Sequence, residues 1–314
     1  MIKIENLSKR YGSKLAVDQI SFEINRGEIL GFLGRNGAGK TTTMNIITGY
    51  ISSSEGRVLL DGHDILDEPR AVKRHIGYLP EQPPLYMDMT VDEYLRFVCA
   101  IKEVSARAAK AHLDEITELV KIADVRKRLI KNLSKGYKQR IGIAQALVGN
   151  PDVIILDEPT IGLDPMQIIE IRTLIKRLGQ DHTLVLSSHI LHEVADVCER
   201  VVIINRGKIV AEDRLANLTA GIGEAYRMAV RVAGPVGEVK QALRGLDGVR
   251  LVESLGAKED GSFDFIVESD RAHDVRREMF ALLSEMNAPL LMLRPMDLTL
   301  EDIFLKLTNE SEGA

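Results

Sequence analysis

The chain has no tryptophan, and aromatic residues make up only 4% of its 314 residues. Its two cysteines, Cys99 and Cys198, form no metal-spaced pair, which argues against a zinc module or a disulfide framework. No run approaches the ~20 apolar residues that a membrane helix needs, and the N-terminus lacks the apolar core of a secretory signal. The formal net charge of -5 gives no general basic character, so nucleic acid is not an expected partner. We therefore expect a cytosolic chain whose membrane role, if any, depends on a partner.

What is present is an alternation of strand and helix patterns over residues 1 to about 212. Val153–Leu156 is apolar on both faces, as a central parallel strand should be. Met166–Leu178 repeats apolar residues at the spacing of one helix face. Strand-like runs include Ser21–Ile24, Glu28–Leu33, Val58–Leu60, Val153–Leu156, Thr183–Ser188 and Val201–Asn205. These patterns predict an α/β domain with a largely parallel core.

We place this first domain at residues 1–217, with a helical subdomain at about 83–140, where strand patterns are missing. The pattern breaks around Asp213–Glu224, which we interpret as a linker. Residues 225–314 then show the order β-α-β-β-α-β, which predicts a small ferredoxin-like α+β domain. A terminal helix is expected at roughly Thr299–Leu307. This second domain contains no recognisable catalytic constellation.

Gly34 to Thr41 reads GRNGAGKT and fits the phosphate-loop pattern G-x-x-x-x-G-K-[ST] completely. It lies between the strand Glu28–Leu33 and a helical run at Thr42–Thr48, which is the context the motif requires. Glycines let backbone N–H groups turn towards a phosphate, and the helix directs its positive end at the same anion. Lys40 is expected to reach the β- and γ-phosphates, and Thr41 to bind Mg²⁺. The candidate phosphate-binding residues are Gly34, Asn36, Gly37, Ala38, Gly39, Lys40, Thr41 and Thr42.

Two carboxylates follow the buried strand Val153–Leu156. Asp157 at the strand end is costly to bury unless it faces a cation, here Mg²⁺ on the phosphates. Glu158 comes next and is placed to orient or deprotonate an attacking water. Together with the phosphate loop, this pair predicts a nucleoside triphosphate hydrolase, while a kinase or GTPase remains open.

The stretch Asn132–Arg140, NLSKGYKQR, resembles the L-S-G-G-Q signature of ABC ATPases and carries three cations. Other marks of that family occur in the expected order over residues 1–212. Tyr11 resembles the adenine-stacking aromatic, Ile161–Asp164 resembles the D-loop with Asp164 at its end, and His189 resembles the switch histidine. The resemblance implies a P-loop fold, ATP as substrate, Mg²⁺ as cofactor, and Glu158 and His189 as catalytic residues.

In that family the signature of one subunit binds the ATP held by the phosphate loop of another. Ser134, Lys135 and Gly136 would therefore contact ATP in trans. Lys135 replaces a glycine of the usual motif, and we expect its side chain at the solvent or the interface rim. The Q-loop departs from the family, because Glu81 stands where its glutamine aligns and Gln82 follows. Either residue is a candidate Mg²⁺ ligand.

Finer details resemble ATPase subunits that pair with separate ABC-2-type membrane proteins. They are LSKG in the signature, IGYLPE at Ile76–Glu81 and LTLEDIFLKLT at Leu298–Thr308. The resemblance implies an exporter, a permease docked near Pro83–Phe97, a second copy or paralogue of the chain, and a peripheral location at the cytoplasmic side of the cell membrane. A soluble ABC ATPase without a transport role is the alternative. A P-loop kinase or GTPase would not explain the signature or His189.

Overall fold

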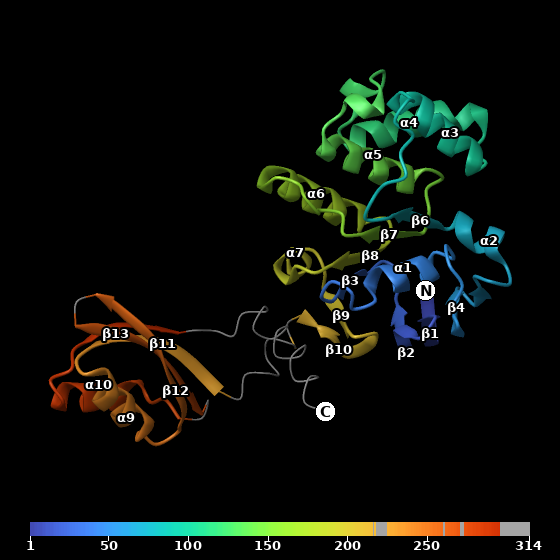
Figure 1. Cartoon of the computed structure of the whole chain (residues 1–314). Helices are drawn as coiled ribbons and strands as arrows, with labels where there is room; N and C mark the ends of the chain where they lie inside the picture. Colours follow the sequence, from blue (N-terminus) through green and yellow to red (C-terminus); the bar gives the residue numbers. More distant parts are fainter. Residues whose placement is uncertain (216, 218–224, 260, 271–272, 296–314) are drawn as a thin grey trace. The chain divides into compact units, whose positions relative to one another are not determined.

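The computed structural model describes residues 1–215, 217, 225–259, 261–270 and 273–295 (Figure 1). The chain divides into two compact units, Met1–Leu215 and Ala216–Ala314. Each unit has its own cluster of buried apolar side chains. We describe the two units separately.

Two sheets organise the described part of the first unit (Figure 1). The antiparallel sheet has the order β2-β1-β4-β5 and consists of β1 (Ile2–Tyr11), β2 (Lys14–Ile24), β4 (Glu55–Leu60) and β5 (His63–Asp64). The larger sheet has the order β10-β9-β3-β8-β7-β6. Its strands are β3 (Ile29–Leu33), β6 (Ile76–Leu79), β7 (Val153–Asp157), β8 (Thr183–Ser188), β9 (Arg200–Asn205) and β10 (Lys208–Arg214). The expected α/β fold with a parallel core is confirmed.

The strand order brings distant sequence motifs to one sheet edge. β3 pairs in parallel with β8 and β9, and β7 pairs in parallel with β6 and β8. Leu33 lies beside Ser188, and Asp157 beside Ser187. Because the carboxyl ends of parallel strands share an edge, the segments that follow β3, β7 and β8 start side by side.

Helix α1 (Lys40–Ile47) supplies Met44, Ile46 and Ile47 to a core that also draws on both sheets. Between β6 and β7 the chain forms the helical part: α3 (Val91–Ile101), α4 (Ala106–Leu119), the 3-10 turns Ala123–Val125 and Ile130–Asn132, and α5 (Lys135–Leu147). The remaining described helices of this unit are α2 (Pro69–Arg74), α6 (Pro165–Leu178) and α7 (Leu191–Ala195). Thr90 starts α3 with a capping box to Glu93, which fixes where the helical part begins.

The first sheet contains strands that the sequence pattern did not indicate, because bulges interrupt its alternation. Pairing of β1 with β2 shifts register between Ile4 and Leu7, where Asn6 has a φ of 46°. Such an extra residue breaks the period of two that marks a strand. The expected linker also begins too early, because Asp213 and Arg214 pair with β9 as the end of β10.

The second unit follows the order β11 (Ala225–Ala233), α9 (Val236–Arg244), β12 (Val249–Glu259), β13 (Ser262–Asp270), α10 (Arg276–Glu285) and β14 (Leu290–Pro295). Its antiparallel sheet has the order β12-β13-β11-β14, which is ferredoxin-like. The helix expected at Thr299–Leu307 lies outside the described residues. Across the described residues of both units, no helix is both long enough and apolar enough to cross a bilayer.

Candidate nucleotide site

The phosphate loop is shaped by glycines that no other residue replaces without strain. Gly37 has a φ of 80° and Gly39 a φ of 113°. A β-carbon on Gly39 would lie 2.7 Å from the carbonyl oxygen of Ala16. Gly39 also begins α1 without any side-chain cap, and the first turn of α1 holds no acidic residue. The first N–H groups and the positive end of α1 therefore remain available to an anion.

Lys40 and His189 both contact Glu158. Lys40 Nζ donates to the carbonyl oxygen of Gly34 at 2.8 Å and lies 3.2 Å from Glu158 Oε1. His189 Nδ1 lies 2.9 Å from Glu158 Oε2. Lys40 and Glu158 are buried, whereas the His189 side chain is 35% exposed. The parallel sheet thus brings the phosphate-loop lysine, the second carboxylate and the histidine into one cluster.

Asp157 is fully buried and lies next to this cluster. Its Oδ1 accepts a hydrogen bond from the Ser187 hydroxyl, while Oδ2 has no hydrogen-bond partner. Burial raises the pKa of the Asp157 carboxyl, and hydrogen bonds from Ser187 and Thr41 act in the opposite direction. A buried carboxylate oxygen without a partner is costly unless a cation satisfies it. Asp157 and Thr41 therefore fit a hard divalent cation with oxygen ligands, such as Mg²⁺.

A cavity of about 350 Å³ lies beside the phosphate loop and Glu158, and neither Asp157 nor His189 lines it. Tyr11, which is half exposed at the end of β1, lines it together with its hairpin partner Lys14. Further lining residues are Ala16, Asn36, Gly37, Gly39, Lys40, Thr41, Thr42, Glu81, Glu158 and Ile161. The sequence motifs do not indicate Lys14, Ala16 or Ile161 as nucleotide contacts, although Lys14 is the cross-strand neighbour of Tyr11 in a tight hairpin.

Glu81 and Gln82 differ in which cavities they line. Glu81 lines the nucleotide cavity, and Gln82 is absent from its lining. Both residues line a second, mostly apolar cavity of about 740 Å³ between the larger sheet and the helical part. Of the two candidate Q-loop residues, Glu81 is therefore the one that lines the cavity beside the phosphate loop.

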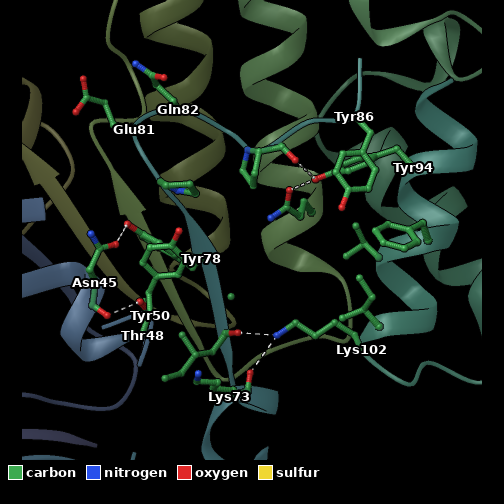
Figure 2. Close-up of a pocket in the computed structure, with 18 of the residues that line it drawn as sticks. Asn45, Thr48, Tyr50, Lys73, Tyr78, Glu81, Gln82, Tyr86, Tyr94 and Lys102 are labelled. Carbon is green, nitrogen blue, oxygen red and sulfur yellow. Dashed lines mark hydrogen bonds between the residues drawn. The ribbon is translucent and has the colours of Figure 1, made fainter. Parts of the chain in front are cut away.

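That second cavity is a groove with aromatic walls. Figure 2 shows Tyr78, Tyr86 and Tyr94 along it, with Glu81 and Gln82 at one end. Lys73 and Lys102 lie at the other end, where Lys102 Nζ donates to two backbone carbonyls. Several large apolar residues of the groove remain exposed: Tyr50 (77%), Tyr86 (50%), Phe97 (37%) and Ile101 (63%). Thr41 lines this groove as well as the nucleotide cavity.

The signature residues do not line the nucleotide cavity of their own chain. Ser134 caps α5, with its hydroxyl accepting from the N–H of Tyr137 at 3.4 Å. Gly136 is buried, and a β-carbon there would lie 2.6 Å from the side-chain oxygen of Gln167 on α6. The signature therefore packs against the start of α6.

The side chain of Lys135 is exposed, as expected. Its ammonium group also lies close to the D-loop segment, because a β-carbon on Gly162 would be 2.1 Å from Lys135 Nζ. The ammonium group thus covers Gly162 in the D-loop segment of the same chain. Arg140, another cation of this stretch, is buried and pairs with Glu170, so it is not a free anion ligand.

Asp164, at the end of the D-loop segment, caps α6. Its Oδ1 accepts from the N–H of Gln167 at 2.9 Å. The side chain is exposed and lies outside the nucleotide cavity of its own chain. In the described structure Asp164 therefore has a structural contact within α6.

Known proteins are similar to this chain in sequence and in structure. The family profile described as ABC transporter matches residues 17–161. The linearmycin resistance ATP-binding protein LnrL of Bacillus subtilis is 33% identical over 99% of this chain and 99% of its own length. This chain belongs to the ABC transporter family. As an ABC ATPase it binds and hydrolyses ATP, so the expected family and activity are confirmed.

Other ABC proteins are similar over about two thirds of the chain. The bacitracin transport ATP-binding protein BcrA of Bacillus licheniformis is 40% identical over 68% of this chain and 69% of its own. The lipopolysaccharide export ATP-binding protein LptB of Haemophilus influenzae is 38% identical over 67% of this chain and 89% of its own. A dimeric bacterial ABC transporter cassette has a TM-score of 0.64, with 28% identity over 68% of this chain and 99% of its own. These likenesses confirm the P-loop ABC fold of the first unit.

Proposed function

We propose that this chain is the ATP-hydrolysing subunit of an ABC-2-type exporter and drives transport by closing and reopening a dimer. The relatives named for bacitracin transport, linearmycin resistance and lipopolysaccharide export support an export role. The observation that carries the enzymatic part is the cluster in which Glu158 contacts both Lys40 and His189. Residues 1–217 form the ATPase domain in this proposal, and residues 225–314 an accessory domain.

In the proposed site, Tyr11 stacks on the adenine at the mouth of the cavity. The phosphate loop and the first N–H groups of α1 hold the phosphates, and Lys40 neutralises the β- and γ-phosphates. Glu158 positions the attacking water and accepts its proton, while His189 orients Glu158 and contacts the γ-phosphate. Lys40 and Glu158 are both buried, which strengthens the charge interactions between them.

Mg²⁺ is the metal that this donor set fits. Thr41 and Asp157 would hold it, with Glu81 as the Q-loop ligand. When bound, the ion supplies charge neutralisation at the phosphate oxygens. Its positive charge also offsets the burial of Asp157, whose Oδ2 has no protein partner.

The signature is proposed to act on the ATP of a second subunit, either another copy of this chain or a paralogue. The start of α5, which carries Ser134 and Gly136, has the positive helix end that suits an anion. Neither residue lines the nucleotide cavity of its own chain. Asp164 ends the D-loop segment and caps α6 through Gln167, the residue on which Gly136 of the signature packs. A solved relative forms a dimer, which supports this arrangement.

The aromatic groove is proposed as the docking site of a membrane permease (Figure 2). Its exposed apolar side chains suit an amphipathic helix of the partner. Thr41 and Glu81 line both the groove and the nucleotide cavity. In this proposal, movement of the docked helix displaces these two residues and so changes the nucleotide site. Docking would place the chain at the cytoplasmic side of the cell membrane.

Glu158→Gln tests the catalytic assignment. It removes the base while keeping the shape, so turnover should fall by about 10²–10⁴-fold while an ATP-bound dimer accumulates. The measurement is steady-state phosphate release beside size-exclusion chromatography with MgATP. Lys40→Ala serves as the comparison, because it should lose ATP binding and dimer formation together. Normal turnover of Glu158→Gln would refute Glu158 as the base.

The transport role is tested by co-purification with a polytopic membrane protein encoded by a neighbouring gene. Ile101→Asp introduces a charge into the groove and should abolish co-purification. Leu66→Asp is the matched control, because Leu66 is 48% exposed outside the groove. Retention of the membrane protein by Ile101→Asp would refute the docking site. Absence of any membrane partner would favour the alternative, a soluble ABC ATPase.

A further inference from the structure

Gln139 is a buried polar residue to which the sequence motifs assign no role. It lies on α5, five residues after Ser134, and is 2% exposed. Its Nε2 donates to the carbonyl oxygen of Pro159 at 2.8 Å. Pro159 directly follows Glu158 in the chain. A helix that begins at the signature is thus hydrogen-bonded to the loop that carries the proposed base.

The loop after β7 depends on such contacts for its shape. Glu158 has a φ of 50°, which is uncommon for a residue other than glycine. Its N–H donates to the carbonyl oxygen of Ser187 at 3.2 Å, and its own carbonyl accepts from the N–H of Ile161. Proline offers no N–H at the next position, so this loop has one backbone donor fewer. Gln139 supplies a side-chain donor at that point and links the loop to α5.

Two other contacts also join α5 to the segment that follows Glu158. Lys135 Nζ covers Gly162, and Gly136 packs on Gln167. Ile161, between Glu158 and Gly162, lines the nucleotide cavity. The signature end of α5 is therefore in contact with the segment from Pro159 to Gln167 at three places, and the Gln139 hydrogen bond is the one nearest Glu158.

We propose that Gln139 is a positioning residue, which sets the orientation of Glu158 in response to the position of the signature helix of the same chain. About five residues of helix, or ~7.5 Å, separate Ser134 from Gln139. Because a helix moves as a rigid body over this length, a shift of its start also shifts the Gln139 side chain and the Pro159 carbonyl that it contacts. Engagement of the signature by the ATP of the other subunit then aligns the base in its own site. This inference rests on the proposed role of Glu158.

Gln139→Leu in the full-length chain tests the inference, because leucine fills the site but cannot donate. Because a 1 Å misplacement of a catalytic group can cost ~10²-fold in rate, kcat should fall by about 10- to 10²-fold. KM for MgATP should stay within about twofold, because the phosphate loop is untouched. The ATP-bound dimer should accumulate in size-exclusion chromatography, since closure proceeds and hydrolysis is slow.

Thr117→Val is the matched control. Thr117 is buried on α4, where its hydroxyl donates to the carbonyl of Leu113 at 2.7 Å, away from the base. The variant also loses a buried side-chain donor to a backbone carbonyl, and kcat should stay at the wild-type value. If Gln139→Leu folds poorly, Gln139→Met keeps an unbranched shape without a donor. Wild-type kcat in the folded Gln139 variant, or equal losses in both variants, would overturn the proposal.

The experiments distinguish failure of the positioning role of Gln139 from failure of Glu158 as the base. If Glu158→Gln is inactive and Gln139→Leu retains full kcat, the base assignment stands and only the positioning role fails. If Glu158→Gln hydrolyses ATP normally, the proposed mechanism fails first. A fall in kcat for Gln139→Leu with an unchanged KM and a trapped dimer supports both.

Discussion

Glu158 shows how one residue depends on several others for its position. Lys40 and His189 each contact one of its carboxylate oxygens, and its backbone adopts a φ of 50°. Residues in sparsely populated backbone regions cost about 1–3 kcal/mol and persist where neighbouring structure holds them. Such strain is common where a side chain has to be aimed, which agrees with the proposed role of Glu158.

The glycines of the phosphate loop should differ in their tolerance. In Gly37→Ala the new β-carbon has no atom within 4 Å. The loss of stability should therefore come only from the left-handed backbone, at about 1–2 kcal/mol. Gly39→Ala adds a collision with the Ala16 carbonyl oxygen and should lose at least about tenfold more ATP affinity, or ~1.4 kcal/mol. Titration with a fluorescent ATP analogue and thermal melting measure both effects. Equal ATP affinity of the two variants would contradict the assigned geometry.

Lys135 and Gly162 should be only weakly coupled in energy, because the ammonium group beside Gly162 is the far end of a flexible, exposed side chain. Lys135→Gly alone should keep ATPase activity within a few-fold of wild type, since an exposed charge contributes only ~0–1 kcal/mol. Gly162→Ala should cost about 1–2 kcal/mol of stability in either background, because Gly162 has a left-handed φ of 68°. A double-mutant cycle by chemical denaturation measures the coupling, and a coupling energy above ~1 kcal/mol would contradict this expectation.

Individual elements explain why the sequence indicated the phosphate loop and β7 more readily than the rest. Both are local patterns, a strand followed by a glycine turn and a helix, or a run that is apolar on both faces. The contacts of Gln139 with Pro159 and of Lys135 with Gly162 join segments about 20 residues or more apart, so no local pattern reveals them. The choice between Glu81 and Gln82 depends on a loop after β6, where periodicity carries no information.

Removing the N-cap of α5 should lower the ATPase activity of the protein as well as its stability. Ser134→Ala removes the hydroxyl that accepts from Tyr137 N–H, which typically costs about 1 kcal/mol. It also removes a proposed contact to the γ-phosphate in the second subunit, so ATPase activity should fall. Ser105→Ala removes the equivalent cap of α4 and should lose similar stability with full activity. Equal activities of the two variants would argue against the signature role.

At the scale of the whole molecule, the two units have separate apolar cores. Phe265→Ala removes a fully buried ring from the second unit and should destabilise that unit by about 3–5 kcal/mol. Calorimetry should then show an earlier transition for the second unit, with the transition of the ATPase unit unshifted. A shift of both transitions together would show that the units unfold cooperatively.

The central claim is that each ATP site combines the phosphate loop of one chain with the signature of another. Mixing Lys40→Ala with Ser134→Arg tests it most directly, because each variant alone should be inactive. In a mixed dimer, one site carries both lesions and the other carries neither. Random pairing of two copies should therefore restore about a quarter of wild-type ATPase activity. Activity that stays at the level of the separate variants after mixing would contradict the composite site formed by two copies of this chain.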